Sequence, residues 1–462
     1  MLGARDAGPG MKGEGLREYL GELGVVPSRQ LGQNFLEDEA VCREIVSSLG
    51  VGPEDCVIEV GPGVGALTMP LLETGARVRA VEFDRKLAAA LQERLADHPR
   101  IVVEQADAAR FDVLSLFPAG PVKLLGNLPY SSGTEILRRF CDPPTPVTEA
   151  VVMLQAEVAE RMQAGPGSKS YGVLSLRIQA YWEVEELLRV SPDKFFPRPQ
   201  VESLVIRLRR KPAEALPPFN GPLFDRLVRR GFAQRRKQLK KQLPLEGEVE
   251  WGAVVSTLGV SSQVRGEELT LAQWVELTRQ LDRIPPAGEG QSGEERFDVV
   301  DECDEVTGQA TRAEVHAQGL RHRAVHLLVA DPRGRVFLQK RSVLKDRHPG
   351  VWDSSAAGHV DAGESYHESA SRELEEELGI LGGEWEAVAK LPAEEATGWE
   401  FIQLYFLRHS GPLHWPAHEI ETGAYFFPER IERWIEARPQ DFAPGFLLCW
   451  SIFREKILNR SG

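Results

Sequence analysis

The stretch CVIEVGPGVGALT, residues 56–68, decides the fold of the first half of this 462-residue chain. Its β-branched start predicts a buried strand, which passes directly into three glycines at alternate positions, Gly61, Gly63 and Gly65, and then into a helical pattern. Glycine permits a sharp turn and the close approach of a bulky ligand, because a Cβ atom would obstruct both. Alone, this glycine turn is weak evidence for a nucleotide-like cofactor, because such turns also serve packing alone, and the neighbouring motifs decide.

The following residues repeat the alternation of strand and helix. Short apolar runs and helical patterns alternate between residues 55 and 155, in the order CVIEV, a helix through 67–72, VRAVEF, LAAALQERL, IVVEQAD and VKLLGNLPY. Such alternation predicts a parallel sheet with helices on both faces. Ligands of these sheets lie at the carboxyl ends of the strands.

Each of these strand ends carries a polar motif. Glu82 can accept hydrogen bonds from both hydroxyls of a ribose. Asp107, after the next strand, can accept a hydrogen bond from the amino group of an adenine. A single carboxylate here could equally be a solvated strand end. Four strand ends with a glycine turn, Glu, Asp and Asn-Leu-Pro-Tyr in this order predict a nucleoside cofactor.

The motif Asn127-Leu128-Pro129-Tyr130 suits chemistry on an adenine. The lone pair of the exocyclic amine is delocalised into the ring, so this amine is a poor nucleophile. If Asn127 and the carbonyl of Leu128 accept its two hydrogens, the nitrogen is drawn towards tetrahedral geometry and its lone pair becomes available. Tyr130 can stack on an extruded base, which contributes roughly 1–3 kcal/mol; alone, it would be read as a half-buried loop aromatic.

Residues 28–283 resemble the rRNA adenine N6,N6-dimethyltransferases, which use S-adenosylmethionine to modify two adjacent adenosines near the 3′ end of small-subunit rRNA. The resemblance rests on motifs in order: LGQNFL (31–36), EVGPGVGALT (59–68), VEFD (81–84), QAD (105–107), NLPY (127–130), LQAEVAERM (154–162), SYGVLS (170–175), FFPRPQVES (195–203) and FAQRRKQLKKQL (232–243). It implies a Rossmann-like domain and a helical RNA-binding subdomain. The proline-rich stretch 211–222, after an apolar strand-like run, predicts the boundary between them, which gives residues 1–211 and 212–283.

The resemblance also implies roles for particular residues. The cofactor contacts would be Asn34, Leu36, Gly61, Gly63, Glu82, Asp107 and Asn127. The group acting on the target adenine would be Asn127, Leu128, Pro129 and Tyr130.

The charge distribution fits an RNA partner in the first half only. The formal net charge is −14, but residues 1–283 hold 36 basic and 38 acidic residues, whereas 284–462 hold 19 and 31. Residues 201–241 carry 12 basic and 3 acidic residues. The family resemblance assigns RNA contacts within this stretch to Arg235, Arg236, Lys237, Lys240 and Lys241; the other interpretation is a solvated basic surface.

Two other functions remain open for this half. Relatives that methylate large-subunit rRNA share the cofactor motifs, but FFPRPQVES and FAQRRK are more similar to the small-subunit enzymes. A ribosome assembly factor with little catalysis is the second alternative, and the intact motifs argue against it. The expected partner is small-subunit rRNA in an immature small ribosomal subunit.

The second half begins after a Gly- and Pro-rich stretch, residues 284–296, which predicts a linker. Residues 358–380 then read GHVDAGESYHESASRELEEELGI. Glu373, Glu376 and Glu377 share one helix face, where their like charges repel unless a cation compensates. Mg2+ or Mn2+ is the expected compensator; a solvated acidic helix is the alternative.

This pattern resembles the Nudix hydrolases, which implies an α/β/α sandwich over residues 297–462. Metal would be bound by Glu373, Glu376 and Glu377, with Gly358, Glu364 and Arg372 completing the site. The implied chemistry is attack of a metal-activated water on a nucleoside-diphosphate-linked substrate. Glu419 or Glu421 is a candidate further ligand.

Residues 304–329 and 345–359 also resemble isopentenyl-diphosphate isomerase, a Nudix-fold enzyme that is not a hydrolase. That enzyme needs a cysteine where this chain has Ala357, so we expect hydrolysis and no isomerase activity. Lys340, Arg341 and Lys345 are candidates for holding substrate phosphates or are surface charges, and Trp352 is expected in the core.

Five separated cysteines, without metal-ligand spacing, indicate reduced thiols in a cytoplasmic protein. No apolar run approaches the roughly 20 residues of a membrane span, so no membrane partner is expected.

Overall fold

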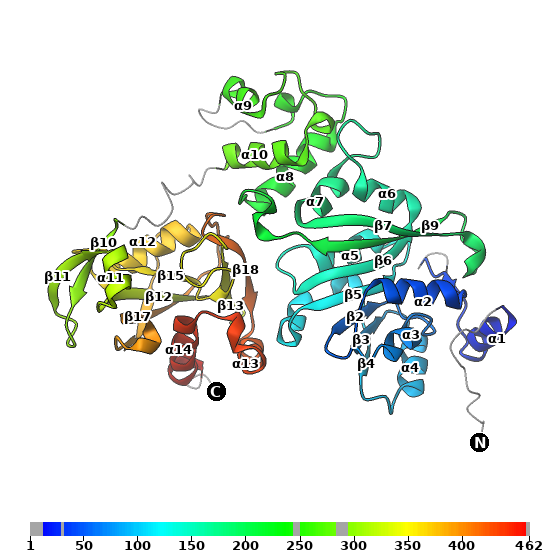
Figure 1. Ribbon diagram of the computed structural model, residues 1–462, viewed down its shortest axis with the longest axis horizontal. Coiled ribbons are helices and arrows are strands. Elements are labelled where there is room, and N and C mark those ends of the chain that lie inside the picture. The colour runs from blue at the N-terminus through cyan, green and yellow to red at the C-terminus, as the bar shows by residue number, and fades with distance from the viewer. Residues whose placement is uncertain (1–12, 29–31, 244–249, 283–293, 459–462) are drawn as a thin grey trace. The chain divides into compact units, whose positions relative to one another are not determined.

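The computed structural model describes residues 13–28, 32–243, 250–282 and 294–458. The chain divides into two compact units (Figure 1). The first comprises Met1–Ala215 with Asp225–Val275, and the second comprises Leu216–Phe224 with Glu276–Gly462. Each unit is described by itself.

The first unit is built on a seven-stranded sheet in the order β4-β3-β2-β5-β6-β9-β7. Its strands are β2 (Cys56–Val60), β3 (Arg77–Glu82), β4 (Ile101–Gln105), β5 (Val122–Asn127), β6 (Val147–Gln155), β7 (Trp182–Val190) and β9 (Ser203–Arg210). The strands β2 to β6 pair in parallel, and β9 runs antiparallel to both β6 and β7. The predicted parallel sheet is confirmed.

Helices cover both faces of this sheet because its buried strands are apolar on both sides. Ile58 of β2 faces a core that includes α5 and α7, whereas its neighbour Val57 faces a core that includes α2, α3 and α4. The helices of this part are α1 (Glu14–Glu22), α2 (Glu39–Ser48), α3 (Thr68–Glu73), α4 (Arg85–Arg94), α5 (Gly133–Cys141), α6 (Ala156–Gln163) and α7 (Val173–Tyr181). A short pair, β1 (Phe35–Leu36) and β8 (Phe195–Phe196), forms a separate two-stranded sheet, and Leu36 packs in the core that Val57 faces.

A helical part follows the sheet, formed by α8 (Gly221–Ala233), α9 (Trp251–Leu258) and α10 (Leu271–Leu281). The ring of Trp274 stacks on Phe232 with centroids 6.0 Å apart. The hydroxyl of Tyr171 donates to the carbonyl of Leu269 at 2.9 Å, which ties the segment before α10 to the segment before α7. The helical character expected for this region is present, while the boundaries at 211 and 283 stay predictions. Most of the predicted linker, 284–296, lies outside the described residues.

The second unit contains a seven-stranded mixed sheet and a two-stranded hairpin. Its strands are β10 (Arg296–Val300), β11 (Val306–Thr311), β12 (His322–Ala330), β13 (Val336–Arg341), β14 (Trp352–Asp353), β15 (Ala356–His359), β16 (Trp385–Leu391), β17 (Glu400–Arg408) and β18 (Ile420–Phe426). Its helices are α11 (Arg312–Gln318), α12 (Tyr366–Leu378), α13 (Pro428–Ala437) and α14 (Pro444–Phe453).

Helices lie on both sides of this second sheet. Leu374 and Leu378 of α12 share a core with Val325 of β12. Phe453 of α14 contacts Phe406 of β17 with ring centroids 5.1 Å apart. The predicted α/β/α sandwich is confirmed. Trp352 is buried as expected and packs edge-on against Trp434.

Among the described residues, no helix has the length and apolar character needed to cross a bilayer.

Two candidate active sites

The carboxyl ends of the first sheet enclose a cavity of about 330 Å³. All the residues expected to contact the cofactor line it: Asn34, Leu36, Gly61, Gly63, Glu82, Asp107 and Asn127. Pro129 and Tyr130 line the same cavity, whereas the side chain of Leu128 lies in the core behind it. The structure therefore brings the predicted cofactor and target groups together around one space.

Glu82 is held at the cavity wall by the backbone. One of its carboxylate oxygens accepts the amide of Gly63 at 2.9 Å, and the other accepts the amide of Asp84 at 2.8 Å. Burial raises the pKa of Glu82, and these two amide donors oppose that rise. The glycine is required here, since Gly63 has φ +58° and an added Cβ would lie 3.2 Å from the ring of Phe35. Glu82 is thus oriented before any ligand arrives and keeps lone pairs for hydroxyl groups.

Asn127 is oriented by the segment that carries Asn34. Its amide nitrogen donates to the carbonyl of Asn34 at 3.0 Å. With the nitrogen engaged in this way, the side-chain oxygen remains the acceptor that Asn127 offers at the cavity. This is the polarity needed to accept a hydrogen from an adenine amine.

Tyr130 is anchored through its hydroxyl group. Its oxygen lies 2.6 Å from the hydroxyl of Ser203, which is fully buried. Burial raises the pKa of Tyr130, so the phenol is neutral at physiological pH. An anchored ring that lines the cavity is a suitable surface for a base, and stacking itself stays a prediction.

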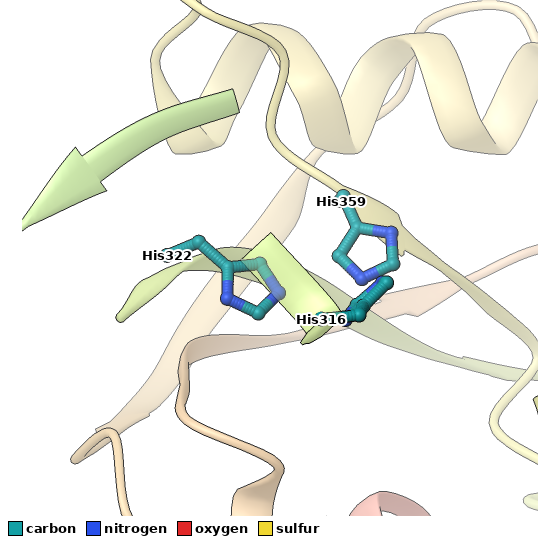
Figure 2. A group of neighbouring side chains, drawn as sticks. All are labelled: His316, His322 and His359. Atoms are coloured by element: carbon teal, nitrogen blue, oxygen red, sulfur yellow. The ribbon is translucent and has the colours of Figure 1, made fainter. Parts of the chain in front are cut away.

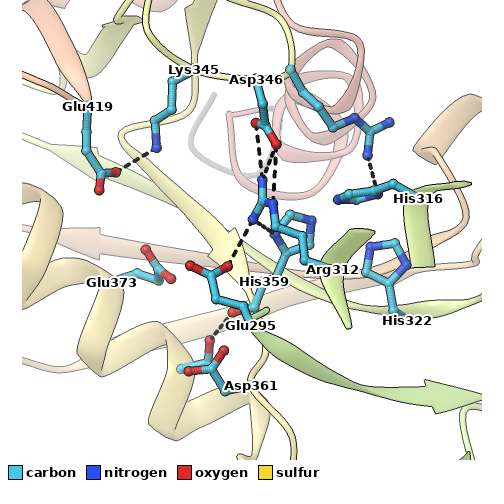
Figure 3. A network of polar contacts seen from close by, with 12 residues as sticks. Glu295, Arg312, His316, His322, Lys345, Asp346, His359, Asp361, Glu373 and Glu419 are labelled. Atoms are coloured by element: carbon cyan, nitrogen blue, oxygen red, sulfur yellow. Dashed lines mark hydrogen bonds and ion pairs between the residues drawn. The ribbon is translucent and has the colours of Figure 1, made fainter. Parts of the chain in front are cut away.

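The second unit holds two neighbouring polar clusters. Three histidines, His316, His322 and His359, lie together at one of them (Figure 2). The other contains Glu373 of α12 and Glu419, which faces Lys345 (Figure 3). The sequence reasoning anticipated the second cluster and missed the first.

Arg372 links three acidic residues, one before α12 and two on it. Its guanidinium contacts Glu364 at 3.1 Å, Glu373 at 2.8 Å and Glu376 at 3.1 Å. Three carboxylates on one cation form a charge-assisted network. The arginine therefore offsets part of the repulsion that the helix face creates.

Glu377 is buried on the inner side of the same helix. One of its oxygens accepts hydrogen bonds from Gln339 at 3.1 Å and from the amide of Ala357 at 3.0 Å. Burial raises the pKa of both Glu377 and Glu373, because the interior disfavours their charged forms. Their electrostatic repulsion adds to this effect.

Glu419 and Glu421 are distinguished by their surroundings. Glu419 lies close enough to raise the pKa of both Glu373 and Glu377, and it pairs with Lys345 at 2.6 Å. Glu421 instead pairs with Lys340 at 2.7 Å. Of the two, Glu419 is the better candidate for a further metal ligand.

Gly358 leaves the space that Glu373 occupies. A Cβ added at this position would lie 1.9 Å from a carboxylate oxygen of Glu373. Such an overlap cannot be relieved without moving the carboxylate. Gly358 does not have a positive φ angle, so backbone conformation does not require a glycine here. The close approach of the Glu373 side chain does.

The geometry can be compared with known proteins. The family model "Ribosomal RNA adenine dimethylase" matches residues 27–283, and the NUDIX domain model matches residues 320–443. Ribosomal RNA small subunit methyltransferase A of Alkaliphilus metalliredigens is 40% identical over 269 residues, which cover 55% of this chain and 91% of that protein. The protein of the same name from Methylococcus capsulatus is 39% identical over 259 residues, 56% of this chain and 98% of that protein.

The chain belongs to the ribosomal RNA adenine dimethylase family. It carries a C-terminal Nudix domain in addition. Among solved structures, DR0079 from Deinococcus radiodurans is 30% identical, with a TM-score of 0.32; the match covers 35% of this chain and 99% of that one.

Phe83 is a residue of this dimethylase cavity that sequence reasoning did not single out. It follows Glu82, lines the cavity and is 53% exposed. An exposed aromatic ring beside Glu82, the carboxylate predicted to bind ribose, offers a face for a nucleobase. The signal was present in the sequence as an aromatic residue at a strand end.

The basic residues of the dimethylase are not equivalent. Arg235 donates to Glu267 at 2.9 Å and to the carbonyl of Lys169 at 2.9 Å, so its guanidinium serves the protein's own structure. Four others are exposed, in turns and a short 3-10 helix after α8: Arg236, Lys237, Lys240 and Lys241. These four fit the predicted RNA contacts better than Arg235 does.

The acidic cluster of the Nudix domain fits a divalent metal. Glu373 and Glu377 are buried carboxylates, Glu376 is exposed beside them, and Glu419 lies opposite. Oxygen ligands of this kind suit Mg2+ or Mn2+. When bound, such an ion activates a water and neutralises phosphate charge.

Proposed function

We propose that the N-terminal part dimethylates the N6 atoms of two adjacent adenosines near the 3′ end of small-subunit (16S) rRNA, using S-adenosylmethionine, in an immature small ribosomal subunit. Two small-subunit methyltransferases are 40% and 39% identical to this chain, which favours this target over large-subunit rRNA. The observation that carries the chemistry is the orientation of Asn127, whose nitrogen is engaged by Asn34 so that its oxygen can accept from the target amine.

Each residue that lines the cavity has its own role in this proposal. Glu82 accepts hydrogen bonds from the ribose hydroxyls, and Asp107 accepts a hydrogen bond from the amino group of the cofactor's adenine. Asn127 and the Leu128 carbonyl accept the hydrogens of the target amine, which localises the nitrogen lone pair. The cofactor supplies an electrophilic methyl group when bound. Tyr130, anchored by Ser203, supports the target base by stacking.

The test is transfer of labelled methyl groups to small ribosomal particles that lack this modification. Label should appear at two adjacent adenosines near the 3′ end of 16S rRNA. Transfer to large-subunit rRNA instead would favour the large-subunit alternative. Binding to the particles without transfer would favour an assembly factor.

We further propose that the C-terminal domain hydrolyses a nucleoside-diphosphate-linked substrate with Mg2+ or Mn2+. The dense carboxylate network around Arg372 supports this function. The position of Ala357, which offers no thiol, supports hydrolysis over isomerisation. A screen of nucleotides and capped RNA for release of phosphate products tests hydrolysis. Turnover of isopentenyl diphosphate by the domain would contradict the proposal that it hydrolyses its substrate and does not isomerise it.

A further inference from the structure

The helix α1 packs behind one wall of the dimethylase cavity. It precedes the match to the dimethylase family, which begins at residue 27. One apolar cluster joins the helix to the rest of the unit and contains Leu16, Leu20, Val25, Phe35 and Leu87. The two leucines of α1 are buried, with 1% and 2% of their surface exposed. The helix is therefore docked on the unit and is not a free extension of it.

The partners of α1 in this cluster are residues of the cavity wall. Phe35 and Leu87 line the cavity, and so does Val64, which packs against the same cluster. Within the described part of the chain, the residues that line the cavity include none from α1. The helix can therefore act on a bound cofactor only through the residues that it supports.

Phe35 connects α1 to the glycine turn. Its ring lies against Gly63, where an added Cβ would be 3.2 Å from the ring. The amide of Gly63 donates to Glu82 at 2.9 Å, so the position of this turn sets the position of the carboxylate predicted to bind ribose. Close-packed interiors transmit displacements, and a change in the packing of Phe35 therefore reaches a polar group of the site.

A second connection runs through Arg94 of α4. The guanidinium of Arg94 donates to the carbonyl of Val64 at 3.3 Å, within the same glycine turn. Tyr19 of α1 lies near this guanidinium, since burial raises the pKa of Tyr19 and the positive charge of Arg94 opposes that rise. An apolar contact and a polar contact thus join α1 to two adjacent residues of the turn.

Both ends of α1 are tied to the unit. The amide of Gly13 donates to the carboxylate of Glu37 at 3.1 Å, next to β1. The ammonium group of Lys86, in the first turn of α4, donates to the carbonyl of Gly24, just after α1. These contacts give the helix a defined position against the cavity wall without any ligand.

We propose that α1 is a clamp for the cofactor side of the cavity, with Leu16 and Leu20 as its positioning residues. The clamp holds Gly63 and Glu82 where the proposed function places the ribose of S-adenosylmethionine, so it sets the affinity for this cofactor. The inference rests on the proposed use of S-adenosylmethionine and adds to it a helix that precedes the family match.

The experiment measures binding of S-adenosylmethionine to the whole chain by calorimetry. Leu20→Ala should weaken binding by roughly 10-fold or more, because misplacing a positioned group by about 1 Å can cost an active site about 100-fold. Leu20→Met keeps the volume of the side chain and should bind as the unsubstituted chain does. Affinity for unmodified small-subunit rRNA should be the same in both variants.

Leu208→Ala is the matched control. Leu208 is fully buried in β9 and lies opposite Ala150, in the first half of β6, whereas the cavity lies at the carboxyl ends of the strands. This variant should lose thermal stability, as Leu20→Ala does, and keep its affinity for the cofactor. If Leu20→Ala also kept its cofactor affinity, or lost affinity for rRNA to the same extent, α1 would serve packing alone and the proposal would be wrong.

A measurement on the unsubstituted chain guards against misfolding of the variants. Coupling between two sites is reciprocal, so a cofactor whose binding depends on α1 must also stabilise the docking of α1. Hydrogen exchange of the amides of α1 should therefore slow when S-adenosylmethionine is added, and exchange in α10 should not change. Unchanged exchange in α1 with the cofactor bound would overturn the clamp alone. Failure of the cofactor to bind at all would overturn the proposed function and the clamp together.

Discussion

The two candidate active sites are ordered by different means. In the dimethylase cavity, backbone groups orient the polar side chains: two amides hold Glu82, and a carbonyl holds Asn127. In the Nudix domain, charged side chains orient one another, with Arg372 contacting three carboxylates. A site held by backbone dipoles is formed without ions, whereas a crowded cluster of carboxylates is complete only with a cation.

The largest effect should come from the cluster that depends on charge. Glu377→Gln removes a proposed metal ligand, and if the metal contributes about 4 kcal/mol to the transition state, hydrolysis should fall by roughly 10³-fold. The same change should stabilise the metal-free domain at alkaline pH. Burial raises the pKa of Glu377, so its stabilising protonated form is lost as pH rises through the folded-state pKa.

Glu375→Gln is the matched control, because Glu375 is exposed on the same helix. Hydrolysis rates with Mg2+ and thermal unfolding with a chelator check the two expectations. Equal rates in both variants would show that charge at position 377 is not used in catalysis.

Asn127→Ala tests the site held by the backbone. Loss of one oriented acceptor should reduce methyl transfer by roughly 10²-fold or more, in line with the removal of a preorganised polar group from other active sites. The loss of methyl transfer should be the same with and without divalent cations. Methyl transfer is measured on unmodified small subunits, with thermal unfolding as the check on folding.

Tyr130→Phe is the companion variant. It keeps the ring and removes only the contact to Ser203, so it should cost far less than the Asn127 change. A loss as large as that of Asn127→Ala would mean that the hydroxyl has a role beyond anchoring the ring.

Gly358→Ala sharpens the comparison because it displaces a carboxylate of the cluster without removing a charge. The added Cβ would overlap a carboxylate oxygen of Glu373, so the Nudix domain should lose about 1–3 kcal/mol of stability and its hydrolytic activity. The dimethylase should keep its activity in this variant. Unfolding curves, hydrolysis and methyl transfer are measured on the same preparation of the variant. Normal hydrolysis would show that the Glu373 carboxylate has room to move.

Sequence reasoning predicted the features that local patterns specify. The parallel sheet followed from alternating strands and helices, and the cavity lining followed from the polar residue at each strand end. The clustering of Glu373, Glu376 and Glu377 along α12 followed from their spacing. In each case the relevant residues are close in sequence or belong to a motif.

Features that depend on contacts between distant segments were not predicted. His316, His322 and His359 look unrelated in the sequence, and only the pairing of β12 with β15 brings the last two together. The commitment of Arg235 to Glu267 could not be read from a run of basic residues. Both carboxylate oxygens of Glu59, in strand β2, are buried without a hydrogen bond to any described residue. The sequence pattern of this strand did not predict that burial.

Glu59 offers a pH test of the first unit. Burial raises its pKa from 4.5 to about 8, so it is protonated in the native state and ionised in the unfolded chain at neutral pH. Its contribution to stability is fully present below about pH 4.5 and is lost as pH rises towards 8. Glu59→Gln should therefore match the parent near pH 5 and exceed its stability at pH 9, by a few kcal/mol at most.

Glu54→Gln provides the comparison, since Glu54 is exposed one turn before the same strand. Chemical denaturation at both pH values measures the difference. An alkaline gain in Glu54→Gln as large as that in Glu59→Gln would mean that burial is not the cause.

The smallest effects are expected on the surface predicted to bind RNA. Lys240 and Lys241 are exposed after α8, so each should contribute one phosphate contact. Because each contact releases a counterion, Lys240→Ala and Lys241→Ala should each lower the slope of log affinity against log salt by about 1 and weaken binding a few-fold at moderate salt. Arg333→Ala, an exposed change in the Nudix domain, should leave the slope unaltered.

Arg235→Ala should behave differently from the lysine variants. Its guanidinium binds Glu267 and the carbonyl of Lys169, so its loss should lower stability more than it lowers the salt slope. Salt-dependent binding to unmodified small-subunit rRNA and thermal unfolding separate the two effects. If Arg235→Ala changed the slope as the lysine variants do, this arginine would exchange its internal partners for phosphate when RNA binds, and the dimethylase would resemble the Nudix cluster in using charge to complete a site.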